Sequence, residues 1–294
     1  MVITSSSNDK LKNIKKLSKS SRERNEQGLY IIEGIRMFRE IPTEDIHSVY
    51  VSESAVERFE AELTDALGET YAEADNFFVV SDRLFESISD TGTPQGILAL
   101  VKMRKLCIDD VLYAEDINCN DKKVGKGDLA NPDNKQGNNT DLFILIIEKL
   151  RDPGNLGTII RTAEGAGVTG IIISSDSVDI YNPKVVRSTM GSIFRVPIYI
   201  SDNLVEDIKA LKEKGITVYG AHLKGKNIYD KDFTTSCAFL IGNEGNGLSD
   251  EVSSTADELI KIPMKGKVES LNAATSTAVI AYEVLRQRSY YGKS

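Results

Sequence analysis

The chain has 294 residues, of which 27% are charged and 40% hydrophobic, so a disordered or fibrous protein is excluded and two domains are expected. No window approaches the ~20 consecutive apolar residues of a membrane-spanning helix, and the N-terminus lacks the apolar run of a secretory signal. Three scattered cysteines and two histidines predict neither a disulfide framework nor a zinc site. We therefore expect a cytoplasmic protein without a membrane partner or a metal.

The net charge of −8 hides a basic segment near the N-terminus. Residues 10–24 contain seven basic side chains and one acid, whereas residues 40–90 contain fourteen acids and two bases. Binding to a polyanion depends on the local density of cations, because each neutralised phosphate releases a counterion. The basic segment therefore leaves RNA open as a partner, although a solvated helix face would have the same composition.

The first hundred residues mix helix and strand patterns. Leu11, Ile14 and Leu17 follow a helical spacing, with lysines on the other face of the helix. The following segments alternate between the two kinds of pattern, with strands predicted over residues 29–32, 48–52, 77–80 and 96–101 and helices over 34–40 and 83–87. This alternation predicts a small α/β domain, to which we assign residues 1–103.

Residues 104–140 are predicted to be a flexible linker or an insertion between two domains. From residue 118 to its end, this segment contains one valine, one leucine and one alanine. So few apolar side chains cannot offset the entropy cost of ordering the chain. We assign the second domain to residues 141–294.

Apolar runs alternate with helical patterns throughout the second domain. The run over residues 142–147, LFILII, is typical of a strand buried on both faces. Other elements follow at short intervals, with strands predicted over residues 170–174, 196–200, 216–219, 237–241 and 259–262 and helices over 156–166, 205–214 and 270–288. We predict a doubly wound, mainly parallel α/β sheet, whose ligands bind at the carboxyl ends of the strands.

Two glycine-rich segments have the spacing of nucleotide-binding motifs in the wrong context. Gly165–Gly170 spells G-x-G-x-x-G between a helix and a strand, the reverse of the order that pyrophosphate binding requires. We predict a helix C-cap and a turn there. Gly220–Asn227 nearly spells a P-loop, but Asn227 stands where Ser or Thr would bind magnesium. A nucleotide-dependent enzyme is therefore a disfavoured hypothesis.

A third segment, residues 150–161, lies where a buried strand ends and a helix begins. Its sequence, LRDPGNLGTIIR, contains a turn, then Asn155 at a position suited to a cap or a ligand contact. Gly157 would let another backbone approach closely. Arg161 lies more than one turn into an otherwise apolar helix, where it is either functional or a surface arginine.

Two more segments place polar side chains beside predicted strand ends. Residues 239–248, FLIGNEGNGL, form an apolar strand and a glycine-dense turn with the carboxylate of Glu244. Residues 260–275 combine a strand end with Ser270, Asn272 and small residues that open a helix. Taken singly, the first is explained by a tight loop and the second by a helix cap.

The three segments together resemble the three motifs of the SpoU (TrmH) family of RNA ribose 2′-O-methyltransferases, in the SPOUT superclass. Asn155 and Arg161 match the Asn and Arg of motif one. The pattern G-x-E-x-x-G-L of motif two matches residues 242–248. The I-P-M and S-L-N elements of motif three match residues 262–264 and 270–272.

The resemblance extends over nearly the whole chain, except the polar insertion. Residues 30–34, YIIEG, and 93–96, TPQG, are similar to the substrate-binding domain of the family, which resembles ribosomal protein L30e. Residues 186–191, VRSTMG, also resemble a family element. Residues 273–276 depart from the family pattern but keep small side chains, so we expect altered packing rather than lost activity.

The resemblance implies a C-terminal α/β domain with a deep trefoil knot, which no periodicity predicts. It also implies S-adenosylmethionine as the cofactor, held in a bent shape largely by backbone contacts. Transferred to this sequence, the expected cofactor contacts are Gly220, Ala221, Ile241, Gly242, Asn243, Glu244, Ile262, Met264, Leu271 and Ala273.

The implied reaction is the in-line transfer of a methyl group from a sulfonium to a ribose 2′-hydroxyl, which depends mainly on alignment. Because the pKa of arginine is above ~12, we expect Arg161 to stabilise the developing alkoxide and clamp the adjacent phosphate, not to take the proton. Asn155 would position Arg161, and Glu244 would hold Arg161 or an equivalent group. Ser270 and Asn272 would orient substrate and cofactor.

The resemblance further implies a homodimer that completes the active site and an N-terminal domain that binds structured RNA. The basic side chains expected to contact RNA are Lys10, Lys12, Arg22, Arg24, Arg36 and, near the catalytic centre, Arg187. Ribosomal RNA, specifically 23S, is favoured over transfer RNA, because the N-terminal domain resembles that of rRNA-directed members. The alternatives are a tRNA 2′-O-methyltransferase and a catalytically inactive RNA-binding SPOUT protein.

Overall fold

The computed structural model describes residues 2–113 and 141–291, which form two compact units. Each unit combines segments that are distant in sequence. The first unit contains residues 2–105, 149–164 and 176–195, and the second contains 106–113, 141–148, 165–175 and 196–291. The predicted domain boundaries at 103 and 141 stay a prediction, and residues 114–140 of the predicted linker lie outside the described residues.

The first unit contains a mixed five-stranded sheet with the order β1-β4-β3-β5-β2. Strand β3 pairs parallel with β4 and antiparallel with β5, which pairs antiparallel with β2. The strands are β1 (Val2–Ile3), β2 (Leu29–Glu33), β3 (Ile46–Ser52), β4 (Phe77–Val80) and β5 (Ile97–Lys102). Each long strand predicted in this region is present, so the expectation of a small α/β fold is confirmed.

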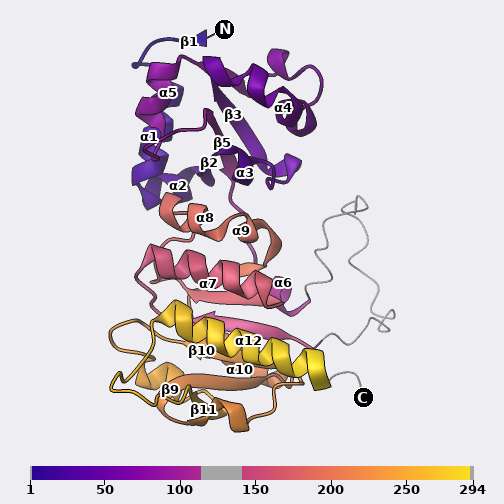
Figure 1. The fold of residues 1–294 in the computed structure, drawn as a ribbon, viewed down its shortest axis with the longest axis vertical. Coiled ribbons are helices and arrows are strands. Elements are labelled where there is room, and N and C mark those ends of the chain that lie inside the picture. The colour runs from indigo at the N-terminus through magenta and orange to yellow at the C-terminus, as the bar shows by residue number, and fades with distance from the viewer. Residues whose placement is uncertain (1, 114–140, 292–294) are drawn as a thin grey trace. The chain divides into compact units, whose positions relative to one another are not determined.

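Helices α1 and α5 cover one face of this sheet (Figure 1). The helical stripe of Leu11, Ile14 and Leu17 is buried there beside Tyr50 and Leu100, as predicted. Asn8 caps α1, because its Oδ1 accepts a hydrogen bond from the Lys10 amide at 2.9 Å. The helices of this unit are α1 (Asp9–Lys19), α2 (Ser21–Gln27), α3 (Ile35–Phe38), α4 (Glu60–Leu67), α5 (Asp82–Ile88), α7 (Pro153–Gly165, to residue 164), α8 (Pro183–Thr189) and α9 (Ser192–Arg195).

Helices α7 and α8 pack closely at Gly157. A Cβ atom at this position would lie 2.3 Å from the Ser188 Cβ and 2.8 Å from the Val185 carbonyl oxygen. No larger residue fits, so the predicted close approach of a backbone at Gly157 is confirmed.

The second unit contains a six-stranded sheet with the order β11-β9-β10-β6-β7-β8. All five pairs of neighbouring strands are parallel, which confirms the predicted parallel sheet. The strands are β6 (Phe143–Ile147), β7 (Gly170–Ser174), β8 (Ile198–Ser201), β9 (Thr217–Asn227), β10 (Cys237–Ile241) and β11 (Glu258–Lys261). The helices are α6 (Ile108–Leu112), α10 (Leu204–Glu213), α11 (Asp250–Ser253) and α12 (Ala273–Tyr291).

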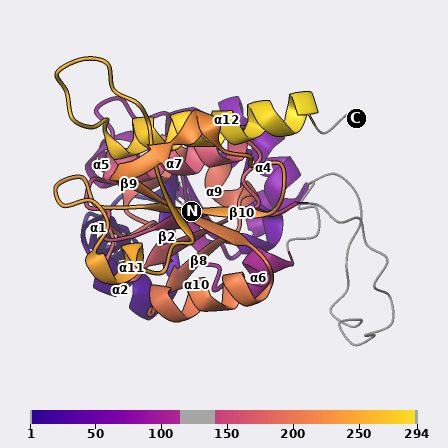
Figure 2. The same cartoon turned by 90° about the horizontal axis from the view of Figure 1, so that it is seen from below.

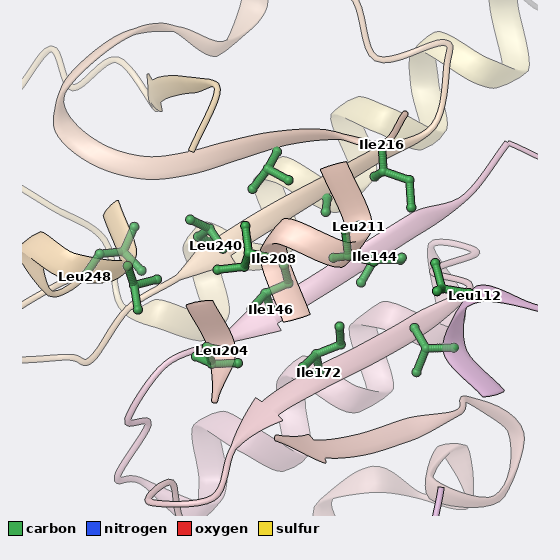
Figure 3. Packing of buried hydrophobic residues seen from close by; sticks show 14 residues of the cluster. Leu112, Ile144, Ile146, Ile172, Leu204, Ile208, Leu211, Ile216, Leu240 and Leu248 are labelled. Atoms are coloured by element: carbon green, nitrogen blue, oxygen red, sulfur yellow. The ribbon is translucent and has the colours of Figure 1, made fainter. Parts of the chain in front are cut away.

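Helices α10 and α12 lie on opposite faces of this sheet (Figure 2). On the α10 face, Leu204, Ile208 and Leu211 follow a helical spacing and pack against alternate residues of β6, Ile144 and Ile146 (Figure 3). Both faces of the central strands are thus covered, which explains the continuous apolar run of β6.

The short elements were the hardest to predict from the sequence. Helices α2, α4, α6, α8, α9 and α11 were not predicted, and the described residues also contain 3-10 turns at Thr43–Asp45, Glu53–Ala55, Glu57–Phe59, Tyr71–Glu73 and Ile228–Asp230. No helix among the described residues has the length and apolarity needed to cross a membrane.

Candidate functional site

A cavity of about 360 Å³ lies at the carboxyl ends of β9, β10 and β11. Its walls come from an irregular part of β9, from the ends of β10 and β11 and the loops that follow them, and from α12, within residues 221–223, 241–248, 260–264 and 269–276, with Ile228 and Ile280 completing the lining. This is the edge at which parallel α/β sheets bind ligands and at which the sequence predicts the ligand site. All the residues that line the cavity belong to the second unit.

The loop after β10 is a tight turn closed by backbone hydrogen bonds. The amide of Asn243 donates to the carbonyl of Gly247 at 3.0 Å, and the Gly247 amide donates back at 2.9 Å. A Cβ at Gly242 would lie 2.2 Å from the Gly247 carbonyl carbon, so only glycine fits there. Motif two therefore fixes a backbone shape, and Glu244 lies exposed on the turn.

A buried glutamate stabilises this turn through a hydrogen bond to the residue that follows it. Glu148 follows β6 and is only 3% exposed, and its Oε2 accepts a hydrogen bond from the Ser249 amide at 2.8 Å. Ser249 in turn caps α11 by accepting from the Val252 amide. Sequence reasoning missed Glu148, although a charged residue directly after the run LFILII was a signal for it.

The segment that nearly spells a P-loop lies within β9. Gly220 pairs with Leu259, but the next residue of β11, Ile260, pairs with Lys226, so the five residues between bulge from the strand. A Cβ at Gly225 would lie 2.4 Å from the Ile260 carbonyl carbon, so this glycine is required for strand packing. The nucleotide-dependent hypothesis is wrong, because no phosphate-binding loop precedes a helix here.

This bulge brings residues 221–223 into the cavity wall. Ala221 was an expected cofactor contact, and the structure adds His222 and Leu223. Gly220 was also expected, but it does not line the cavity and instead faces Leu259, with 2.8 Å between its notional Cβ and the Leu259 Cδ2.

Motif three forms the start of α12. The predicted helix start at residue 270 is wrong: α12 begins at Ala273, because the Asn272 Oδ1 accepts from the Ala274 amide at 2.9 Å and caps the helix. Ser270, Leu271 and Ala273 line the cavity, and Asn272 does not.

The cavity combines an apolar wall with a few charged side chains. Ile241, Leu248, Ile260, Ile262, Met264, Leu271 and Ile280 contribute the apolar wall. Glu244 and Glu269 add two carboxylates, and His222 and Lys261 add two basic groups. His222 Nδ1 accepts a hydrogen bond from the Lys224 amide at 3.1 Å. His222 and Glu269 lie outside the motif positions, which is why sequence reasoning missed them.

Asn155 and Arg161 lie on α7, which belongs to the first unit. The Asn155 amide donates to the Asp152 Oδ1 at 2.8 Å in the first turn of α7. Arg161 is exposed, and within the described part of the chain its guanidinium makes no hydrogen bond or ion pair.

Four of the basic residues expected to contact RNA are exposed on the first unit: Lys10, Lys12, Arg22 and Arg36. Lys10 Nζ lies 4.3 Å above the Phe78 ring. Burial, followed by the nearby charges of Lys102 and Lys10, lowers the pKa of His47 below its ordinary value. Cations and an aromatic ring thus lie together here.

The other two expected RNA contacts pair with carboxylates that are distant in the sequence. Arg24 is only 3% exposed, and its Nη2 lies 2.5 Å from the Asp179 Oδ2. The assignment of Arg24 to RNA binding is wrong, because this guanidinium is enclosed by protein. Arg187 is partly exposed and pairs with Asp90 at 2.6 Å.

A parallel α/β sheet with a small-molecule cavity at its carboxyl edge places this protein in the class of α/β proteins that bind small ligands. The sequence model of the SpoU rRNA Methylase family matches residues 142–282, and that of the MRM3-like substrate binding domain matches residues 8–99.

Individual relatives cover most of the chain. The 23S rRNA (guanosine(2553)-2′-O)-methyltransferase RlmP of Bacillus subtilis is 29% identical over 283 residues, 96% of this chain and 98% of that one. YacO of the same organism, described as a TrmH family tRNA/rRNA methyltransferase, is 36% identical over 69% of this chain and 74% of its own length. The AdoMet-bound rRNA methyltransferase from Sinorhizobium meliloti has a TM-score of 0.76 and 26% identity, with 97% of each chain covered.

The chain therefore belongs to the SpoU (TrmH) family of RNA methyltransferases, and the resemblance predicted from its motifs is confirmed. The α/β fold of the family is confirmed as well. The trefoil knot stays a prediction.

Proposed function

We propose that this chain transfers the methyl group of S-adenosylmethionine to a ribose 2′-hydroxyl of ribosomal RNA, with 23S rRNA as the favoured substrate. The cavity is the observation that supports this most directly. Nine of the ten residues expected to contact the cofactor line it, all except Gly220. They were selected by their motif positions alone, so their convergence on one cavity supports a common ligand.

The residues around the cavity suit this cofactor chemically. The volume of about 360 Å³ is within the range of ~300–1,000 Å³ typical of small-molecule sites. The isoleucine and leucine side chains suit an adenine ring, and the glycines of the tight turn let the backbone come close to a ligand. The carboxylates of Glu244 and Glu269 complement an ammonium and a sulfonium. When bound, S-adenosylmethionine supplies an activated methyl group.

The residues of the chain would align and activate the hydroxyl. Arg161 is exposed and makes no polar contact with the described residues, so its guanidinium is available to an incoming phosphate or alkoxide. It stays protonated throughout and stabilises negative charge that develops on the 2′-oxygen. Asn155 orients the first turns of α7, Glu244 contributes a carboxylate to the cavity wall, and Ser270 faces the ligands from the same wall.

Asn272 acts through α12, since its side chain caps that helix beneath the cavity wall. The basic side chains of Lys10, Lys12, Arg22 and Arg36 bind the RNA, and that of Arg187 binds it nearer to the reacting ribose. We also infer a homodimer through the methylase domain that completes the site, and a cytoplasmic location, where ribosomal RNA is found.

The test combines cofactor binding with methyl transfer. Calorimetry with S-adenosylhomocysteine should give micromolar affinity with one site per chain. Tritiated S-adenosylmethionine should label a 23S rRNA transcript, and Arg161→Ala should lower kcat at least ~100-fold with the S-adenosylhomocysteine affinity within twofold of wild type. Arg39→Ala, an exposed arginine remote from the motifs, is the control.

The possible outcomes separate the alternatives. Methylation of tRNA instead of rRNA transcripts would identify a tRNA enzyme. RNA binding without methylation of either would identify an inactive RNA-binding SPOUT protein. Retained methyl transfer by Arg161→Ala would reject the role given to that residue.

A further inference from the structure

The first unit joins the substrate-binding region, residues 8–99, to elements of the methylase region. The innermost link is the pair between Arg24 on α2 and Asp179 on the segment before α8. Arg24 contacts the Asp179 Oδ2 through Nε at 2.9 Å and Nη2 at 2.5 Å, and its Nη1 donates to the Leu17 carbonyl at 2.5 Å. The guanidinium is therefore fixed by both regions at once.

Contacts continue from Asp179 into α7. The Asp179 Oδ1 accepts from the Tyr181 amide at 2.8 Å, and the Tyr181 ring packs on Tyr30 of β2 with 4.5 Å between ring centroids. Asn182 then caps α8, and α8 packs against α7 at Gly157 with no space for a side chain. Rigid elements thus connect α2 to the helix that contains Arg161.

A second link reaches α7 directly. Arg195 of α9 lies between two carboxylates, with its Nη1 2.5 Å from the Glu40 Oε2 and its Nε 3.1 Å from the Glu164 Oε1. Glu40 belongs to the substrate-binding region, and Glu164 lies on α7 three residues after Arg161. One guanidinium therefore connects the substrate-binding region to the turn of α7 next to Arg161.

We propose that Asp179 and Arg195 are positioning residues that fix α7 to the substrate-binding region, so that RNA held by this region and the guanidinium of Arg161 move as a single body. The proposal rests on the proposed function, in which Arg161 acts on the ribose. Alignment to within about 1 Å controls the rate of such a transfer, and a displaced helix lowers the rate even when both ligands are bound. The links therefore affect kcat rather than ligand affinity.

The test compares Asp179→Asn and Arg195→Gln with Arg39→Gln. The control removes an exposed ion pair with Glu62 that lies wholly within the substrate-binding region. We expect kcat for RNA methylation to fall about tenfold in the two test variants, with KM for RNA and the affinity for S-adenosylhomocysteine within twofold of wild type. Arg195→Lys, which keeps a cation between the two carboxylates, should recover most of the loss. Arg39→Gln should behave as wild type.

Hydrogen exchange gives a second measurement that does not depend on activity. The amides of α7 should exchange faster in Arg195→Gln than in wild type or Arg39→Gln, while those of β6 and β10 stay unchanged. If wild type fails to methylate RNA but α7 exchange still rises, the proposed function fails and the coupling stands. If kcat of both test variants stays within twofold of wild type, or falls equally in Arg39→Gln, the proposal is overturned. A loss of kcat matched by a loss of cofactor affinity would also overturn it, since that indicates general damage.

Discussion

The two units of this chain use different kinds of residue to build their candidate sites. In the second unit, the cavity is shaped by glycines and small or apolar side chains whose positions are fixed by backbone contacts. In the first unit, the candidate groups are arginines and lysines, and several of them pair with carboxylates. A glycine that close packing requires indicates the same backbone shape wherever its motif occurs, whereas the role of a charged side chain depends on the partner it contacts. Motif reasoning is therefore safer for the second unit than for the first.

The largest effect is expected from Gly242→Ala, which tests whether backbone shape alone controls the cavity. The added Cβ would lie 2.2 Å from the Gly247 carbonyl carbon, and neither backbone segment can yield without breaking the turn. We expect the affinity for S-adenosylhomocysteine, measured by calorimetry, to fall at least ~100-fold with the sheet still folded. Gly266→Ala, where a Cβ meets nothing within 4 Å, is the matched control. Equal affinities for the two variants would contradict this account.

The next largest effect is expected from Arg24→Met, which tests whether Arg24 has a structural role or binds RNA. Arg24→Met leaves Asp179 without its buried partner, so we expect the free energy of unfolding to fall by about 3 kcal/mol in urea denaturation. The dependence of RNA affinity on salt should not change, because this guanidinium is not available to a phosphate. If RNA affinity depends less on salt in a folded Arg24→Met protein than in wild type, Arg24 contacts RNA after all.

These differences explain what the sequence could predict. The strands over residues 77–80, 170–174 and 237–241 were predicted with the observed bounds, because their apolar runs end at turn residues on both sides. The bulge in β9 was not, since it depends on pairing with β11 about 35 residues away. Asp179 lies 155 residues from Arg24, so no local pattern connects them. Contacts between distant segments escaped prediction, while strands bounded by turn residues were accessible.

A smaller effect is expected at an exposed cation of the first unit. Lys10→Gln should weaken binding of an rRNA fragment about threefold and lower the slope of log affinity against log salt by about 1, because one phosphate contact is lost. Lys209→Gln, at an exposed position of α10 in the second unit, is the control. The slopes would be measured by filter binding between 50 and 200 mM salt, as an order-of-magnitude range over which such contacts are resolved. An unchanged slope for Lys10→Gln would make this lysine part of a solvated helix face.

The smallest effect is a change in the protonation of His47, whose imidazole pKa reports on the charges around Lys10. Burial and then the charges of Lys102 and Lys10 lower the pKa of His47 below its ordinary value of about 6.5. The neutral ring is thus favoured in the folded state, and its contribution to stability is present above pH ~6.5 and is lost as the pH falls through the lower, folded pKa.

An RNA phosphate bound beside Lys10 would oppose this shift, because an anion favours the protonated ring. NMR titration of the imidazole should therefore show a higher pKa in the RNA complex than in the free protein. Lys10→Gln should raise the pKa in the free protein, since one neighbouring cation is removed, and should reduce the further rise on RNA binding. A pKa that stays the same in the complex would exclude phosphate contact at Lys10 and leave RNA binding to the cations elsewhere on the first unit.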